Sequence, residues 1–347
     1  MLIYMLLFKI EMLMKKGTSF LVVKGKSAYI SINWALMNNC NYKCSYCHSD
    51  LNSGSIKPPS YEVVIKFVEK IIAHSNKLGL TPYFEFGGGE ITILRYFSEL
   101  IKFIHKQNGL VIIVSNGSKP LQWWRDNTEY LNGVSLSYHI NDIKNEAHFV
   151  NVAKILESSK NTRLHINVMM NTQRFNDCYL FSEHLKEQVK CSIALQPLYE
   201  GFGHGAITKN YNYTAEQESL MQTFRGRSDD KELPEPRDLL DIEYLDGSTK
   251  TLSTFDLLIN DKVNFIGWDC YAGVESMVIT FAGEIYRAWC MQDGAIGSIY
   301  DDEITLPTNP TRCRTKICQC GADISSTKIN RNGVQQPNSR IVIKEVD

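Results

Sequence analysis

A regular alternation of strand and helix patterns between residues 27 and 200 restricts most strongly the folds open to this sequence. Short apolar or β-branched runs predict strands at 28–33, 82–86, 110–115, 133–138, 163–170 and 191–196. Six successive β/α steps require a parallel sheet covered by helices, either a doubly wound sheet or a barrel or partial barrel. In such folds the chemistry lies at the carboxyl ends of the strands.

Amphipathic stretches between these strands predict the helices. The clearest begins after Ser60, a typical N-cap residue, with Glu62 in its first turn and Val64, Phe67 and Ile71 on one face. Further helices are predicted at 92–106, 121–131, 145–158 and 175–187. Charged and turn-forming residues dominate from 201 to 264, which predicts a connecting or inserted region.

Cysteine usage separates this chain from most globular sequences. It has ten cysteines in 347 residues, and eight of them fall into two groups, residues 40–47 and 270–320. Clustered thiols in a long chain indicate metal ligation in a reducing cytosol rather than a secreted disulfide scaffold. The other two, Cys178 and Cys191, are expected to be buried apolar residues. A net charge of −1 argues against a protein that coats nucleic acid.

The first sixteen residues are apolar enough to resemble a signal peptide. However, Lys9 and Glu11 interrupt the run, the Lys15–Lys16 pair follows it, and no small-residue cleavage site comes after. The run is also too short to span a bilayer. We expect this segment to form a helix that packs on the rest of the protein. The alternative is that translation begins later, at Met12 or Met14. A cytoplasmic protein without a membrane partner is therefore predicted.

The first cysteine group follows the first predicted strand directly. Cys40, Cys44 and Cys47 have the spacing C-x3-C-x2-C, so three thiolates on one loop can hold three corners of a cubane cluster. The fourth iron would then stay open to an exogenous ligand. A structural zinc knuckle is the alternative, with His48 as the adjacent fourth ligand.

A second motif ends the second predicted strand, where Gly87-Gly88-Gly89-Glu90 follows Phe86. Glycines let a backbone approach a ligand closely, and a carboxylate can accept hydrogen bonds from an ammonium group. With these two motifs the chain resembles the radical S-adenosylmethionine (radical SAM) superfamily, whose signature CxxxCxΦC matches CNYKCSYC with Tyr46 as the aromatic residue. The resemblance covers about residues 27–200 and implies a partial (β/α)6 barrel with a small cysteine-rich extension.

The resemblance also implies which residues bind SAM. Gly88, Gly89 and Glu90 match the segment that binds its amino group, and Ser115 and Asn116 match a TNG-like element on the third strand. Ser137 and Asn167 on the next two strands point to the same region. His139 and Gln196 are also near it, but ordinary packing is favoured for both. The implied cofactors are SAM and a 4Fe–4S cluster, reduced by an electron donor such as flavodoxin or ferredoxin.

The second cysteine group surrounds a predicted hairpin, with strands 276–281 and 284–289 joined by Ala282-Gly283. This run resembles the twitch form of the SPASM extension, which implies an auxiliary 4Fe–4S cluster. Six residues separate Gly283 from Cys290, more than is usual there. The ligands implied are Cys270, Cys290, Cys313 and either Cys318 or Cys320. The spare cysteine would be structural or a hydrogen donor, and a structural zinc stays open.

These interpretations divide the chain into an N-terminal segment (1–26), a radical SAM core (27–200), a connecting region (201–264), an auxiliary-cluster domain (265–325) and a tail (326–347). Superfamily members with such extensions often cross-link or epimerise ribosomally made peptides, which we take as the expected substrate class. A small-molecule substrate is the alternative. Because only about 26 residues precede the core, leader recognition would need a separate protein. A non-catalytic zinc or iron–sulfur protein is the remote rival.

Overall fold

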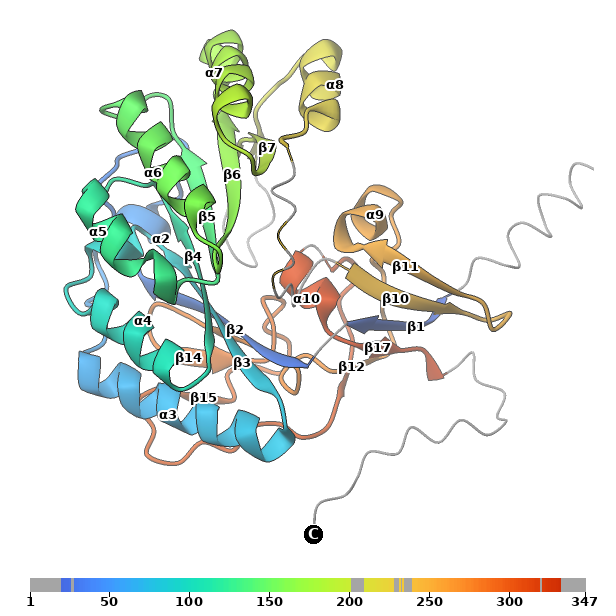
Figure 1. Ribbon diagram of the computed structural model, residues 1–347. Helices are drawn as coiled ribbons and strands as arrows, with labels where there is room; N and C mark the ends of the chain where they lie inside the picture. The colour runs from blue at the N-terminus through green and yellow to red at the C-terminus, as the bar shows by residue number, and fades with distance from the viewer. Residues whose placement is uncertain are drawn as a thin grey trace, which may run out of the picture. The chain divides into compact units, whose positions relative to one another are not determined.

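The computed structural model describes residues 20–25, 28–200, 209–227, 231, 233, 239–318 and 320–331. The chain divides into two compact units (Figure 1). The larger unit comprises Ser27–Pro236 and Gly273–Thr308, and the smaller unit comprises Met1–Lys26, Arg237–Ala272 and Asn309–Asp347. The predictions made for residues 1–19 and for the tail beyond residue 331 lie outside the described residues.

The larger unit is built on six parallel strands that are neighbours in sequence order, as the β/α alternation predicts. They are β2 (Tyr29–Met37), β3 (Thr81–Gly88), β4 (Leu110–Ser115), β5 (Gly133–Tyr138), β6 (Arg163–Met170) and β7 (Ser192–Pro197). Their helices are α3 (Tyr61–Leu78), α4 (Phe97–Lys106), α5 (Leu121–Asn127), α6 (Glu146–Ser158) and α7 (Phe175–Gln188). Figure 1 shows α3 to α7 side by side along one face of this sheet. The mixed α/β class is thus confirmed, while its closure into a partial barrel stays a prediction.

Shorter elements complete this part of the chain. They are α2 (Ser49–Asn52), the 3₁₀ turns η1 (Ile91–Ile93), η2 (Thr128–Tyr130) and η3 (Thr172–Arg174), the strands β8 (Tyr199–Glu200) and β9 (Lys209–Asn210), and α8 (Ala215–Thr223).

Two predicted helices differ from the structure. The helix predicted at 92–106 is interrupted, because Thr92 donates its N–H and its hydroxyl to the Glu90 carboxylate and joins a 3₁₀ turn instead. The helix predicted at 121–131 ends as α5 and continues as η2. There the side chains of Asn127 and Thr128 donate to the carbonyls of Trp123 and Trp124, an alternative to regular helix hydrogen bonding.

The core of the larger unit lies between the sheet and its helices. Trp34 on β2 packs edge-on against Phe67 of α3, with ring centroids 5.3 Å apart, and also against Phe86 of β3. All three side chains are buried. Burial of each contributes about 1.5–3 kcal/mol of folding free energy. This packing fixes the strand ends that carry both sequence motifs.

The predicted hairpin forms, and it joins the parallel sheet. Strand β13 (Ser276–Ile279) pairs antiparallel with β14 (Glu284–Tyr286), which pairs with β15 (Gly297–Ser298). Strand β13 also runs parallel to β2, with Ser276 opposite Ser31. The sequence interpretation grouped this hairpin with the second cysteine group, whereas by contacts the hairpin belongs to the larger unit.

The smaller unit assembles three distant segments into one sheet, in the order β11-β10-β1-β17-β12-β16. Its elements are β1 (Phe20–Gly25), β10 (Leu239–Tyr244), β11 (Thr249–Ser253), α9 (Thr254–Ile259), β12 (Asp269–Cys270), β16 (Thr311–Arg312), α10 (Gly321–Ser325) and β17 (Lys328–Ile329).

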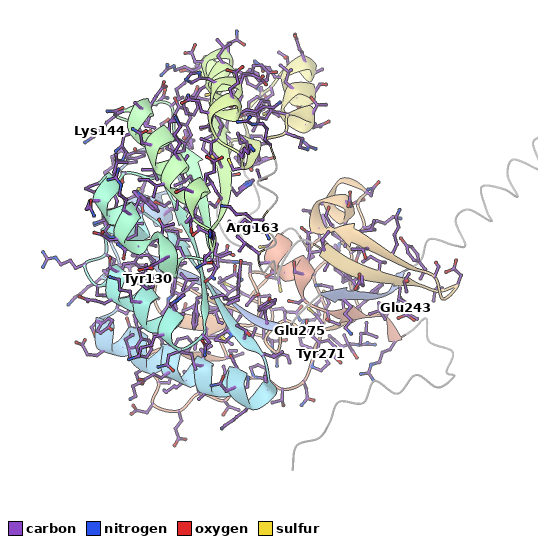
Figure 2. The ribbon with its side chains drawn as sticks, in the orientation of Figure 1. Tyr130, Lys144, Arg163, Glu243, Tyr271 and Glu275 are labelled. Carbon is purple, nitrogen blue, oxygen red and sulfur yellow. The ribbon has the colours of Figure 1, made fainter. Side chains whose placement is uncertain are left out.

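Part of the predicted connecting region is therefore regular structure. Along β10, Leu240 and Ile242 are buried while Asp241 and Glu243 are exposed, the alternation of a half-buried strand. Figure 2 shows Glu243 on this strand. Charged side chains on the exposed face concealed the pattern in the sequence. Residues 201–208 of the same region lie outside the described part of the chain.

Within the described residues, no helix is long and apolar enough to cross a membrane.

The N-cap of α3 offers a test of the fold. The Ser60 side chain accepts a hydrogen bond from the Val63 N–H at 3.4 Å. We expect Ser60→Ala to lower the free energy of unfolding by about 1 kcal/mol, because an N–H of the first turn loses its acceptor. Ser60→Asp should retain stability, since aspartate is an equally good cap. Urea unfolding monitored by circular dichroism measures both variants, and equal midpoints for Ala and Asp would contradict the expectation.

Candidate functional site

The carboxyl ends of the parallel strands surround a cavity of about 320 Å³ in the larger unit. It brings together most of the residues that the sequence predicts for the cluster and for SAM: Cys40, Cys44, Cys47, Gly88, Gly89, Glu90, Ser115, Asn116 and Ser137. Asn167 is not among the lining residues. Its side-chain amide donates to Ser135 Oγ at 2.9 Å, and its oxygen lies 3.0 Å from His165 Nε2.

The cysteine loop is closed by Asn38, which directly follows β2. This side chain is 1% exposed, and its Nδ2 donates to Ser53 Oγ at 3.1 Å and to Ser55 Oγ at 3.2 Å. The side-chain oxygen Oδ1 of Asn38 accepts a hydrogen bond from the Ile56 N–H. Within the loop, His48 caps α2, because its Nδ1 accepts the Asp50 N–H at 3.2 Å. The histidine considered as a zinc ligand thus has a local structural partner.

The three cysteines of this loop have the side-chain chemistry that holds a thiolate-bound group such as an iron–sulfur cluster. The Cys47 N–H donates to the Cys44 carbonyl at 3.0 Å, so a turn brings these two cysteines together. The Tyr42 N–H points to Cys40 Sγ at 3.4 Å. Burial raises the pKa of the Cys40 thiol and raises that of Cys47 to about 11. A bound metal would supply the positive charge that deprotonates such thiols.

No group of three or more His, Cys, Asp or Glu side chains in the described residues has an arrangement that could hold a metal ion.

The two motifs are joined by direct backbone contact. The Gly89 N–H donates to the Met37 carbonyl at 2.8 Å, and the Glu90 N–H donates to the Asn39 carbonyl at 2.9 Å. A Cβ on Gly89 would lie 2.1 Å from the Asn39 carbonyl oxygen, and one on Gly88 would lie 2.3 Å from that of Met37. Gly88 also has a φ of 119°. The glycines are therefore required for the approach to the chain that leads into Cys40.

Glu90 fastens the end of β3 to the end of β4. Its carboxylate is 1% exposed, and Oε1 accepts hydrogen bonds from the Thr92 N–H, the Thr92 hydroxyl and the Ser115 hydroxyl. Oε2 accepts from the Asn116 N–H at 2.6 Å. Burial raises the pKa of this carboxyl, and the four hydrogen bonds oppose that rise. Oε2 keeps a lone pair for one more donor.

Asn116 links the β4 end to the cysteine loop. Its Nδ2 lies 3.0 Å from Asn41 Oδ1 and 3.9 Å from Cys40 Sγ. The Asn41 amide in turn donates to Ser118 Oγ at 2.8 Å. Asn116, predicted as a SAM contact, therefore also contacts the first cysteine of the loop.

Aromatic side chains form one wall of the cavity. The Tyr46 hydroxyl lies 2.7 Å from His139 Nδ1, and the two rings are nearly parallel. Tyr42 meets the same imidazole edge-on. Burial lowers the pKa of His139 to about 4, with Asp142 opposing, so this imidazole is neutral near pH 7.

Sequence reasoning undervalued part of this wall and missed the rest. His139 and Gln196, for which ordinary packing was favoured, both line the cavity. Tyr42 and Met169 were not predicted. Asp142 was missed too, although its Oδ1 accepts the Lys43 N–H at 3.1 Å. Its position three residues beyond His139, after the end of β5, was the available signal.

Four cysteines of the second group lie in the smaller unit, and Cys290 lies in the larger one. Cys270 is on β12 between β16 and β17, and Cys313 exchanges backbone hydrogen bonds with Gly267 and Trp268. Cys318 is held by its N–H, which donates to the Val263 carbonyl at 2.9 Å. Burial raises the pKa of the Cys318 thiol, Lys328 opposes this, and Asp323, Cys270 and Cys320 add to it.

Comparison with known families agrees with the cavity. Residues 34–177 match the family model of the Radical SAM superfamily. This match includes the cysteine loop and the β3 motif. It agrees with the resemblance to the radical SAM superfamily that the sequence shows over about residues 27–200.

Curated relatives match over parts of the chain. A 7,8-dihydro-6-hydroxymethylpterin dimethyltransferase of Methanocaldococcus jannaschii is 33% identical over 96 residues, which are 27% of this chain and 18% of the relative. An S-adenosylmethionine-dependent nucleotide dehydratase of Flammeovirga pacifica is 27% identical over 157 residues, 44% of this chain and 51% of the relative. The chain thus spans about half or less of these relatives' own lengths.

Solved structures give low similarity scores. The anSMEcpe structure with bound AdoMet is 20% identical, with a TM-score of 0.44 over 78% of this chain and 74% of that one. Streptococcus suis SuiB bound to the precursor peptide SuiA is 13% identical, with a TM-score of 0.48 over 79% of this chain and 63% of SuiB.

Two adjacent glycine positions give a matched test of the contact between the motifs. Gly89→Ala should displace the chain that leads into Cys40, because its Cβ has no room beside the Asn39 carbonyl. Gly87→Ala is the control, since nothing lies within 4 Å of a Cβ at that position. After anaerobic reconstitution, we expect Gly89→Ala to lose at least half of the iron bound at the first cysteine group. Gly87→Ala should keep it, and equal iron in both variants would refute the clash.

Proposed function

We propose that the chain is a radical SAM enzyme. Cys40, Cys44 and Cys47 would hold a 4Fe–4S cluster, and the glycine-rich end of β3 would contact SAM. The observation that carries this proposal is the single cavity in which both motifs meet. Three thiols on one loop leave one corner of a cubane without a protein ligand, and the same cavity provides polar groups for a second ligand.

When bound, the cluster supplies one electron to the sulfonium of SAM, so that the S–C5′ bond breaks to give methionine and a 5′-deoxyadenosyl radical, which takes a hydrogen atom from the substrate.

The residues of the chain position SAM and exclude water. The free lone pair of Glu90 Oε2 is suited to the ammonium group of SAM, while the other oxygen stays fixed by its three donors. Ser115, Asn116 and Ser137 are the proposed polar contacts along the next two strands. Asn167 is a further proposed contact. Tyr42, Tyr46 and His139 cover the cavity with rings that limit its hydration.

We propose a second 4Fe–4S cluster at the second cysteine group, as the resemblance to a SPASM or twitch extension implies. Cys270, Cys313, Cys318 and Cys320 lie in the smaller unit and support this proposal. After burial and the charge of Asp323, the charges of Cys270 and Cys320 add to the raised pKa of the Cys318 thiol, so both act electrostatically on it. Cys290 stays a ligand predicted from the motif. Such a cluster would bind or oxidise the substrate, or relay electrons.

For the substrate we propose a ribosomally made peptide, which would be cross-linked or epimerised. The support is the resemblance of residues 265–325 to extensions that accompany such chemistry. A small molecule is the second candidate, because the two sequence relatives described above are named for reactions on small molecules. We also propose flavodoxin or ferredoxin as the electron donor, a separate protein for leader recognition of a peptide, and a cytoplasmic location.

Cleavage of SAM tests the first proposal. The reconstituted chain, reduced with dithionite, should form 5′-deoxyadenosine and methionine from SAM, which mass spectrometry detects. Replacement of Cys40, Cys44 and Cys47 together by Ala should abolish both products. Cys178→Ala is the matched control, because this thiol is buried elsewhere in the core. Absence of 5′-deoxyadenosine from the iron-loaded chain would overturn the proposal. Stimulation of its formation by peptides or by small molecules would then distinguish the substrate classes.

Iron content tests the second cluster. We expect about eight irons per reconstituted chain and about four in the variant that lacks the first three cysteines, since each cubane holds about four. Replacement of Cys270 and Cys313 by Ala should also leave about four. Zinc in place of iron at the second group would contradict the auxiliary cluster without affecting the first site.

A further inference from the structure

Lys328 is a buried lysine of the smaller unit whose ammonium group donates to backbone carbonyl oxygens. The side chain is 1% exposed, and Nζ donates to the carbonyl oxygens of Asp323 at 2.5 Å, Ile324 at 3.2 Å and Ser326 at 2.8 Å. The ring of Phe265 lies 5.0 Å from Nζ. These contacts use the three donors of the ammonium group. The buried carboxylate of Asp323 is the acidic side chain that acts on Cys318 together with Lys328.

Such a charge needs a compensating anion. Removal of an ammonium group from water is costly unless the charge is paired, and carbonyl dipoles and a ring face compensate only in part. Lysine normally extends its charged end to solvent, even where it caps a helix. The three carbonyls belong to α10 and to the residue that follows it, so a helix cap explains the hydrogen bonds. A cap does not explain why the charge is buried.

Cysteine thiols and the carboxylate of Asp323 are the acidic groups near this lysine. Lys328 pairs with Cys270 across the β12–β17 ladder. The ammonium group also opposes the rise in the pKa of the Cys318 thiol that burial causes. A fixed positive charge therefore lies near Cys270 and Cys318, whose thiols become anionic when they bind a metal.

We propose that Lys328 provides the counter-charge of the anionic, thiolate-bound cluster in the smaller unit and raises its reduction potential. The inference rests on the second cluster proposed above. A cubane held by thiolates is negatively charged and gains one more negative charge when it takes up an electron. A nearby ammonium group stabilises the reduced form more than the oxidised form, which makes reduction easier. Lys328 is thus a positioning and tuning residue, not a ligand.

The test uses the full chain in which Cys40, Cys44 and Cys47 are replaced by Ala, so that only the second site can be reconstituted. Three substitutions separate charge from hydrogen bonding: Lys328→Met removes both, Lys328→Gln keeps a donor without charge, and Lys328→Arg keeps charge and donors. Lys250→Met is the matched control, because it removes an exposed positive charge from the same unit. Redox titration followed by electron paramagnetic resonance measures the midpoint potential, together with iron content and circular dichroism.

We expect Lys328→Met and Lys328→Gln to shift the midpoint potential to more negative values, with at least a tenfold fall in the equilibrium constant for reduction, or about 59 mV for one electron. Lys328→Arg and the Lys250→Met control should keep the potential of the parent. Loss of iron from the Lys328→Met and Lys328→Gln variants, with unchanged circular dichroism, would support the same role. Without iron, Lys328→Gln should unfold at about the temperature of the parent, because its amide still donates to the carbonyls and only the buried charge is removed.

Two outcomes would overturn the inference while the cluster stands. The first is a midpoint potential of the Lys328→Gln variant equal to that of the parent. The second is a lower unfolding temperature of the iron-free Lys328→Gln variant, which would show that Lys328 serves the stability of the fold. A parent chain that binds no iron would instead disprove the second cluster, and this inference with it.

Discussion

The backbone contact between the ends of β2 and β3 governs the geometry of the site. Two hydrogen bonds, from Gly89 to Met37 and from Glu90 to Asn39, hold the chain just before Cys40 against the end of β3. The space between the two backbones admits no Cβ. A short motif that looks like a ligand-binding loop is therefore also the support of the cysteine loop. One contact sets the separation of the two motifs.

The buried carboxylate of Glu90 extends this contact to β4. A carboxylate away from water is tolerated where donors surround it, and Glu90 accepts four hydrogen bonds. From the β4 end, Asn116 reaches Asn41 and approaches the thiol of Cys40. The position of the first cysteine thus depends on three consecutive strands. A substitution at the end of any of these three strands would therefore change the position of the Cys40 thiol.

Local patterns predicted the elements that local chemistry determines. Strands 110–115, 133–138 and 163–170 were predicted to the residue, because polar residues or glycines bound each apolar run. The start of α3 after Ser60 was also predicted, since a cap and an amphipathic face coincide. Both motifs could be recognised because their residues are close in sequence.

Non-local pairing explains what the sequence did not show. Strand β1 pairs with β10, more than two hundred residues later, and no periodicity in either segment identifies the other. The same limit applies to Lys328, which lies on a strand of two residues where no alternation can mark a buried position. His139 was undervalued because a single histidine beyond a strand end gives no sign of its contact with Tyr46.

The two cysteine groups have different charged neighbours. At the first, burial and then the carboxylate of Glu90 raise the pKa of the Cys40 thiol, while the backbone N–H groups of Tyr42 and Asn41 and the charge of Lys43 oppose this rise. At the second, the ammonium group of Lys328 lowers the pKa of Cys318 against the effect of burial and so favours added negative charge. If the second group holds a cluster as proposed, the positive charge of Lys328 favours its reduced form. A cluster with that bias is suited to accept an electron from a substrate radical, which is oxidised in the transfer, rather than to supply one for SAM cleavage.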